Sequence, residues 1–195
     1  MIDMYSTYKN YLCQQVSSFQ IPFRRFLQTV KPELIIEIGT GQGGLSIFLN
    51  DILNEFNLNC KQITYDIDND NNGVILNHNI TAKNPINFFM KDVFSDIEYL
   101  TTLINSYGTT IVLCDGGNKV KEFQTFAPLI KQYDFIMGHD YAKDLNFFNT
   151  HINQKIWNWF ELSGEDVQDA IINNNLQYFM NDDFSKIVWL CTQKV

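Results

Sequence analysis

Three side chains that could bind a cation or accept a proton follow two apolar runs of the sequence. Asp115 follows the run at residues 109–114, and His139 and Asp140 follow the run at residues 135–137. Both runs have the length and composition of buried strands. Neighbouring parallel strands lie about 5 Å apart and end at the same edge of a sheet, where ligands gather. We therefore expect Asp115, His139 and Asp140 to converge on one point.

Two carboxylates and an imidazole at one point could hold a divalent cation, which lowers the pKa of a bound hydroxyl group. Mg²⁺ prefers oxygen ligands, so His139 favours a softer metal, a place beside the metal, or a role as general base. A metal-free site, with Asp140 capping a loop and His139 packed against a pocket, stays open. Lys119 is the second candidate base, and its alternative is a solvated residue at the start of a helix.

A glycine-rich segment from Glu37 to Gly44 lies between an apolar run and an amphipathic stretch. Its glycines allow a tight turn and let a ligand approach the backbone, and the following helix offers free N–H groups. The spacing satisfies the dinucleotide pattern GxGxxG and equally the ExGxGxG loop of class I S-adenosylmethionine methyltransferases. Glu37 favours the second interpretation, because a carboxylate repels a pyrophosphate and attracts an ammonium group.

The predicted binding site for this donor combines the glycine loop with acids at later strand ends. Asp66 could accept the ribose hydroxyls, with Asp68 as the alternative. Asp92 could accept the adenine amino group with Val93 against the ring, or it could cap a helix that begins at residue 94. The full predicted set is Glu37, Gly39, Thr40, Gly41, Gly43, Asp66, Asp92, Val93 and Asp115.

Strands alternate with helices along the chain, which predicts right-handed βαβ crossovers and a mostly parallel sheet. The expected strands are residues 34–38, 61–65, 86–90, 109–114, 135–137, 176–180 and 185–191. The expected helices are residues 5–30 with an interruption at Pro22, 43–56, 94–104, 120–130 broken near Pro128, 152–162 and 165–173. The Asn-Asp-Asp at residues 181–183 predicts a turn that makes the last two strands antiparallel.

The stretch from residue 113 to residue 141, with DGGNK and HDY, resembles the cephalosporin hydroxylase and rhamnosyl O-methyltransferase family. That family is similar to the catechol and caffeoyl-CoA type metal-dependent O-methyltransferases, and the resemblance covers about residues 30–195. It implies a Rossmann-like α/β fold of seven strands in the order 3-2-1-4-5-7-6, helices on both faces and a C-terminal antiparallel hairpin.

The resemblance also implies an activity: methyl transfer from S-adenosylmethionine to a hydroxyl of a small molecule or sugar. Mg or Mn would bind Asp115, His139 and Asp140, and His139 departs from the usual oxygen ligands. Lys119, one residue displaced, would match the lysine that serves as base in catechol-type enzymes. Lys119, His139 and Asp115 are therefore the expected catalytic residues.

Composition narrows the class of protein. The chain has 195 residues, which predicts one domain over 1–195, with a helical segment at 1–30 and a Rossmann-like core at 31–195. Lys and Arg number 14 against 22 Asp and Glu, and the net charge of −8 argues against nucleic-acid binding. No apolar run approaches the roughly 20 residues of a membrane span, and no secretory signal is visible. Four scattered cysteines predict reduced thiols in the cytoplasm.

Several alternatives stay open at this stage. An NAD(P)-dependent oxidoreductase and a non-catalytic binding module on the same fold are the rival functions, and the acceptor and the oligomeric state, a homodimer included, are not specified. Trp157, Trp159 and Phe160 are expected in the core, with the wall of an acceptor pocket as the alternative. The acidic string at residues 68–73 is expected to form a solvated turn.

Overall fold

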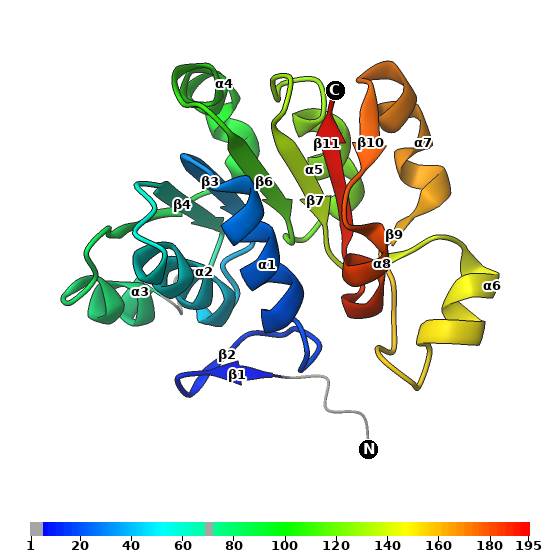
Figure 1. Ribbon diagram of the computed structural model, residues 1–195, viewed down its shortest axis with the longest axis horizontal. Coiled ribbons are helices and arrows are strands. Elements are labelled where there is room, and N and C mark those ends of the chain that lie inside the picture. The colour runs from blue at the N-terminus through cyan, green and yellow to red at the C-terminus, as the bar shows by residue number, and fades with distance from the viewer. Residues whose placement is uncertain (1–5, 69–71) are drawn as a thin grey trace.

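A seven-stranded sheet forms the centre of the computed structural model, which describes residues 6–68 and 72–195 (Figure 1). The strand order is β10-β11-β7-β6-β3-β4-β5, which confirms the order that the family resemblance implied. Strands β3 to β7 pair in parallel, and β11 pairs antiparallel with both β7 and β10. The strand bounds are β3 Leu34–Ile38, β4 Lys61–Asp66, β5 Ile86–Met90, β6 Thr110–Cys114, β7 Phe135–Gly138, β10 Leu176–Tyr178 and β11 Leu190–Lys194.

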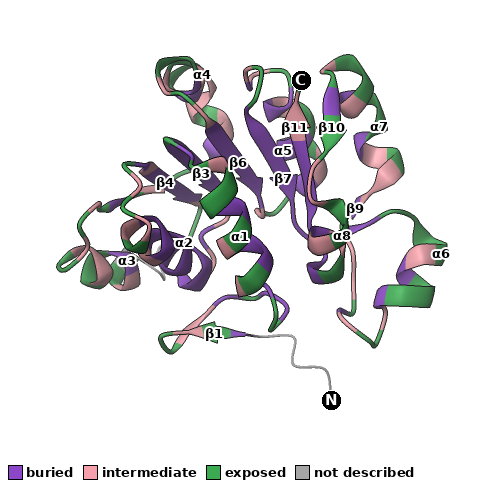
Figure 2. Ribbon diagram, in the orientation of Figure 1, coloured by how far each residue is buried: buried purple, intermediate pink, exposed green. Residues whose placement is uncertain are grey.

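Helices cover both faces of the sheet, and the central strands are buried on both sides (Figure 2). Alternate residues of β3 show this, because Ile35 packs into one apolar cluster and Ile36 into the other. One face carries α1 Gln20–Val30, α2 Gly44–Glu55 and α8 Asn181–Phe184, and the other carries α4 Ile97–Ser106, α5 Lys119–Phe126 and α7 Gly164–Asn173. The helix α3 Asn72–Asn79 packs beside β5.

Short elements complete the chain. They are the hairpin β1 Thr7–Tyr8 and β2 Tyr11–Leu12, the parallel pair β8 Tyr141–Ala142 and β9 Leu162–Ser163, the helix α6 Leu145–Phe147, a π-helical turn Phe148–Ile152, and 3-10 helices Val93–Asp96 and Ser185–Ile187. Residues 69–71 of the predicted acidic turn lie outside the described residues, and Asn72 already begins α3. Among the residues that the structure describes, none of the helices has the length and apolar character that crossing a bilayer demands.

The predicted helix over residues 5–30 is wrong in its first half. Residues 7–12 form the β1–β2 hairpin, and the helix begins only at Gln20. Pro22 does not interrupt the helix, because it lies in the first turn, where backbone N–H groups have no partner within a helix.

The predicted helix over residues 152–162 is also wrong. Only one turn forms here, with the N–H groups of Lys155, Ile156 and Trp157 donating to the carbonyl oxygen of Ile152, and the polar groups that follow bind the edge of the sheet. The backbone N–H groups of Glu161 and Leu162 donate to the carbonyl oxygen of Asp140, and the Trp157 indole donates to the Asp140 carboxylate. Three hydrogen bonds to Asp140, which follows β7, therefore hold the segment against the sheet, and the helix does not continue beyond this turn.

The predicted antiparallel pairing of the last two strands is confirmed, but the predicted tight turn between them is wrong. Residues 181–187 form α8 and a 3-10 helix in place of a tight turn, so β11 begins at Leu190 rather than at residue 185. Asp182 and Asp183 favour a helix N-terminus as well as a turn. Phe184 decides between them, because it is fully buried against Phe23 and Phe26 of α1.

Candidate active site

The glycine loop after β3 crosses the carboxyl edge of the sheet in a conformation that requires glycine. Gly39, Gly41 and Gly43 all have positive φ, of 89°, 51° and 78°. A Cβ atom on Gly39 would lie 2.2 Å from the carbonyl oxygen of Asp115, so the loop packs directly on the end of β6. Because Gly39 has no side chain, its backbone is exposed to the two cavities described below.

The first cavity, of about 260 Å³, lies at the ends of β3, β4 and β5, beside the loop that joins β6 to α5. Gly39, Asp66, Asp92 and Val93 of the predicted donor site line it. The Asp66 carboxylate accepts hydrogen bonds from the backbone N–H groups of Gly41, at 2.9 Å, and of Asp68, at 3.0 Å. Each oxygen keeps a second lone pair for a ligand hydroxyl.

Asp92 performs the capping role that the sequence offered as an alternative. Its carboxylate accepts a hydrogen bond of 2.9 Å from the backbone N–H of Phe94 and caps the 3-10 helix that begins at Val93. The same residue lines the first cavity, so the capping role does not exclude contact with a ligand.

The second cavity, also of about 260 Å³, lies at the ends of β6 and β7. Gly39 lines both cavities, so a single extended ligand could pass from one to the other over it. The rest of the lining contains all the predicted metal and catalytic residues, which are Asp115, Lys119, His139 and Asp140. It also contains Gly41 of the predicted donor site, and Gln14, Trp157, Trp159 and Glu161.

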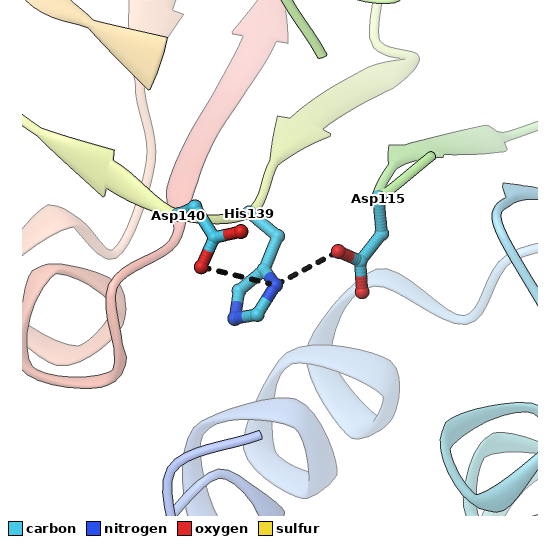
Figure 3. A group of neighbouring side chains, drawn as sticks. All are labelled: Asp115, His139 and Asp140. Atoms are coloured by element: carbon cyan, nitrogen blue, oxygen red, sulfur yellow. Dashed lines mark hydrogen bonds and ion pairs between the residues drawn. The ribbon is translucent and has the colours of Figure 1, made fainter. Parts of the chain in front are cut away.

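The structure brings Asp115, His139 and Asp140 together as expected (Figure 3). The Nδ1 atom of His139 lies 2.8 Å from Oδ1 of Asp115 and 3.7 Å from Oδ1 of Asp140. One ligand atom from each residue lies within 4.8 Å of the others, a spacing that a small contraction would fit to one cation. Asp140 reaches this position from a left-handed backbone conformation with φ of 53°.

The His139 imidazole is fixed on its other sides by aromatic rings. It stacks on Trp189, with ring centroids 4.9 Å apart, and only 3% of its surface is exposed. Burial lowers the pKa of His139, but the carboxylates of Asp115 and Asp140 raise it more, so the net direction is upward. Within the described chain no donor or acceptor reaches its Nε2 atom.

Lys119 is not the solvated helix residue that the sequence offered as an alternative, since only 7% of it is exposed. Its ammonium lies 2.7 Å from Glu161, 3.2 Å from Asp140 and 4.0 Å from Asp115, and it donates to the carbonyl oxygen of Gly116. Burial lowers the pKa of Lys119, but the three carboxylates raise it well above the usual value. The side chain is therefore an ammonium at neutral pH, which opposes a role as base.

The sequence reasoning missed Gln15, which connects the site to the N-terminal segment. Its amide nitrogen donates to Oδ2 of Asp115 at 3.0 Å, and its amide oxygen accepts from the Trp189 indole at 2.7 Å. Gln15 thereby orients both the acid and the ring that flank His139. No motif surrounds this glutamine, so no local signal could have identified it.

Trp157 and Trp159, which the sequence analysis expected in the core, pack against the core and also line the second cavity. Trp157 is buried in the core and also lines the second cavity, where Trp159 lies beside it with ring centroids 4.8 Å apart. Phe160 packs on Phe148 instead. Glu161, in the same segment, was also missed.

Three of the predicted donor-binding residues line neither cavity. Gly43 is the N-cap of α2, Thr40 is buried with its hydroxyl 2.7 Å from that of Thr64, and Glu37 is fully buried beneath the loop. The Glu37 carboxylate accepts a hydrogen bond from the Ser46 hydroxyl of α2. Direct contact of Glu37 with a ligand therefore stays a prediction, and its observed contacts anchor the loop to α2.

Replacing Glu37 by Gln is expected to change how stability depends on pH. Burial raises the pKa of Glu37 to about 8, against the hydrogen bond from Ser46, which lowers it. The folded state thus holds a proton that the unfolded state has released above its value of 4.5, so this contribution to stability falls as pH rises from 4.5 through 8. Thermal melts should show Glu37→Gln gaining Tm relative to the wild type as pH rises from 5 to 9. Exposed Glu98→Gln is the control, and a pH-independent Tm difference for Glu37→Gln would contradict the expectation.

The family model of rhamnosyl O-methyltransferases and CmcI matches residues 4–186. The chain belongs to the rhamnosyl O-methyltransferase/CmcI family. Solved structures of CmcI share its fold: the apo form has a TM-score of 0.69 at 14% identity, covering 97% of this chain and 76% of CmcI. A CmcI complex with Mg and SAM has a TM-score of 0.66 at 15% identity, with the same coverage.

A putative caffeoyl-CoA O-methyltransferase from Staphylococcus aureus also has this fold, with a TM-score of 0.58 at 14% identity over 90% of this chain and 82% of its own. No curated protein sequence matches the chain. At these low identities the solved structures establish only the fold of this chain. Its membership of the rhamnosyl O-methyltransferase/CmcI family is established by the family model.

Proposed function

We propose that the protein is an S-adenosylmethionine-dependent O-methyltransferase that acts on a hydroxyl of a small molecule. The observation that carries the proposal is the meeting of two cavities at Gly39, one lined by strand-end acids and the other by an acid–imidazole cluster. Family membership and the SAM and SAH complexes among structures of the same fold support it.

The first cavity has the groups that a nucleoside needs. Asp66 can accept from ribose hydroxyls, and Asp92 can accept from an exocyclic amine, beside the apolar side chain of Val93. The bare backbone of Gly39 and Gly41 leaves room for the rest of the donor along the loop. S-adenosylmethionine bound here would supply an electrophilic methyl carbon on its sulfonium group.

The second cavity has the groups that an acceptor hydroxyl needs. Methyl transfer requires the acceptor oxygen to be aligned with the methyl carbon and to lose its proton. Lys119 stays an ammonium and acts through its charge. In a metal-free site the imidazole–carboxylate pair of His139 and Asp115 is the remaining predicted base, held in place by Gln15 and Trp189. Trp157 and Trp159 offer apolar faces to the acceptor.

A divalent cation fits this donor set. Asp115, His139 and Asp140 would hold it, and the ammonium of Lys119 beside the same carboxylates supports a site suited to positive charge. The imidazole favours Mn²⁺ or a softer ion over Mg²⁺. When bound, the cation would lower the pKa of the acceptor hydroxyl and orient it.

Calorimetric titration with S-adenosylhomocysteine and with NADH separates this proposal from its oxidoreductase rival. We expect micromolar binding of S-adenosylhomocysteine and no heat with NADH, because the carboxylates of Asp66 and Asp115, which line the cavities together with Gly39, would repel a pyrophosphate. Release of S-adenosylhomocysteine from S-adenosylmethionine, measured over a panel of phenols, catechols and sugars with Mn²⁺, then identifies the acceptor. NADH binding without S-adenosylhomocysteine binding would refute the proposal.

A further inference from the structure

The ammonium of Lys119 lies beside the carboxylate oxygens that a metal ion would bind. It lies 3.2 Å from Oδ2 of Asp140 and 4.0 Å from Oδ1 of Asp115, the two carboxylates of the proposed metal site. A cation bound to both carboxylates would be about 2 Å from each oxygen, so the ammonium and the metal would be near neighbours. Two positive charges at that distance in a buried site repel strongly.

Glu161 offers the ammonium a second position. Its carboxylate lies 2.7 Å from the Lys119 nitrogen, and half of the Glu161 side chain is exposed at the mouth of the cavity. The flexible four-carbon stem of a lysine can move its charge by rotation alone. Lys119 can therefore leave the inner carboxylates and remain paired with Glu161.

We propose that Lys119 is a tethered counter-cation that competes with the divalent metal for Asp115 and Asp140, and that Glu161 receives the ammonium when the metal binds. This inference rests on the metal assistance of the proposed function. Without metal, Lys119 neutralises the acid cluster and holds the irregular segment before β9 against the sheet through Glu161. With metal, the same ammonium faces the mouth of the acceptor cavity.

Binding of Mn²⁺, measured by loss of the electron paramagnetic resonance signal of the free ion, tests the competition without any acceptor. Lys119→Met should bind Mn²⁺ about tenfold more tightly than the wild type or better, because one repelling charge is gone. Lys83→Met, which removes an exposed positive charge at the opposite edge of the sheet, should leave the affinity unchanged. Equal or weaker binding by Lys119→Met would overturn the proposal.

Glu161→Gln tests the second position and remains informative where Lys119→Met fails to fold, since Glu161 is at the surface. It should weaken Mn²⁺ binding, because the ammonium then has only the inner carboxylates as partners. In the Lys119→Met background, Glu161→Gln should change the Mn²⁺ affinity much less, because that variant has no ammonium to pair with Glu161. An equal effect in both backgrounds, or unchanged affinity in Glu161→Gln alone, would overturn the proposal.

Calorimetry with S-adenosylhomocysteine on the same samples distinguishes this inference from the proposed function. Normal S-adenosylhomocysteine affinity with no Mn²⁺ binding in any variant would overturn the competition and leave the methyl-donor assignment standing. Loss of S-adenosylhomocysteine binding in the wild type, with the expected order of Mn²⁺ affinities intact, would overturn only the donor assignment.

Discussion

Asp115→Asn is expected to lower the rate of methyl transfer by about a hundredfold to a thousandfold. Asp115 contacts three side chains of the site. Its two oxygens accept from Gln15 and from His139, and it lies beside Lys119. An asparagine has one acceptor and one donor at these positions, so it can satisfy Gln15 or His139 in its present orientation but not both.

The loss of charge in this variant acts in the same direction. An amide is a poor ligand for a divalent cation, and it no longer favours a proton on the imidazole. The initial rate of S-adenosylhomocysteine release, with the acceptor from the panel, measures the effect. Asp169→Asn, on the exposed face of α7, is the matched control and should be fully active. A rate within tenfold of the wild type would exclude Asp115 from the chemistry.

Gly39→Ala is expected to abolish binding of S-adenosylhomocysteine and to lower Tm by about 10 °C. The added Cβ would lie 2.2 Å from the carbonyl oxygen of Asp115 and 2.6 Å from its carbon, and both are backbone atoms that cannot rotate away. The φ of 89° adds strain for any residue with a side chain. Together these cost on the order of 3–5 kcal/mol, which corresponds to such a shift for a chain of this size.

The control for this substitution is Gly73→Ala in the first turn of α3, where a Cβ would meet no atom within 4 Å. It should bind S-adenosylhomocysteine normally and melt at the wild-type temperature or slightly above. Calorimetry and thermal melts measure both variants. Wild-type affinity in Gly39→Ala would show that the bare backbone between the cavities is not where the donor passes. Gly41 is less constrained, because its Cβ would meet only the end of the Gln14 side chain.

The sheet and the acid cluster could be predicted because their signals are local. Strands β3, β6 and β7 are short apolar runs, and the strand order is the one that the family resemblance implied. Asp115, His139 and Asp140 directly follow their strands, so parallel pairing of β6 and β7 was sufficient to place them together.

The remainder of the site depends on contacts between distant segments, which no local pattern encodes. Residues 152–162 have helical spacing, but bonds to Asp140 and Lys119 override it. Lys119 has the sequence context of an exposed helix start and becomes buried only when Glu161 covers it. Glu37 has the position of a ligand-facing acid, and the sequence did not indicate that one of its oxygens accepts a hydrogen bond from Ser46 of α2.

The amide of Gln15 joins residues that are far apart along the chain, with 100 positions separating it from Asp115 and 174 from Trp189. A chain emerging from the ribosome would have Asp115 and His139 available well before Trp189 was synthesised. The acid would then have no fixed orientation, and the imidazole would have no ring to rest on. Chemical competence of the pocket is thus expected to appear late and all at once, so that incomplete or partly folded chains would consume no methyl donor.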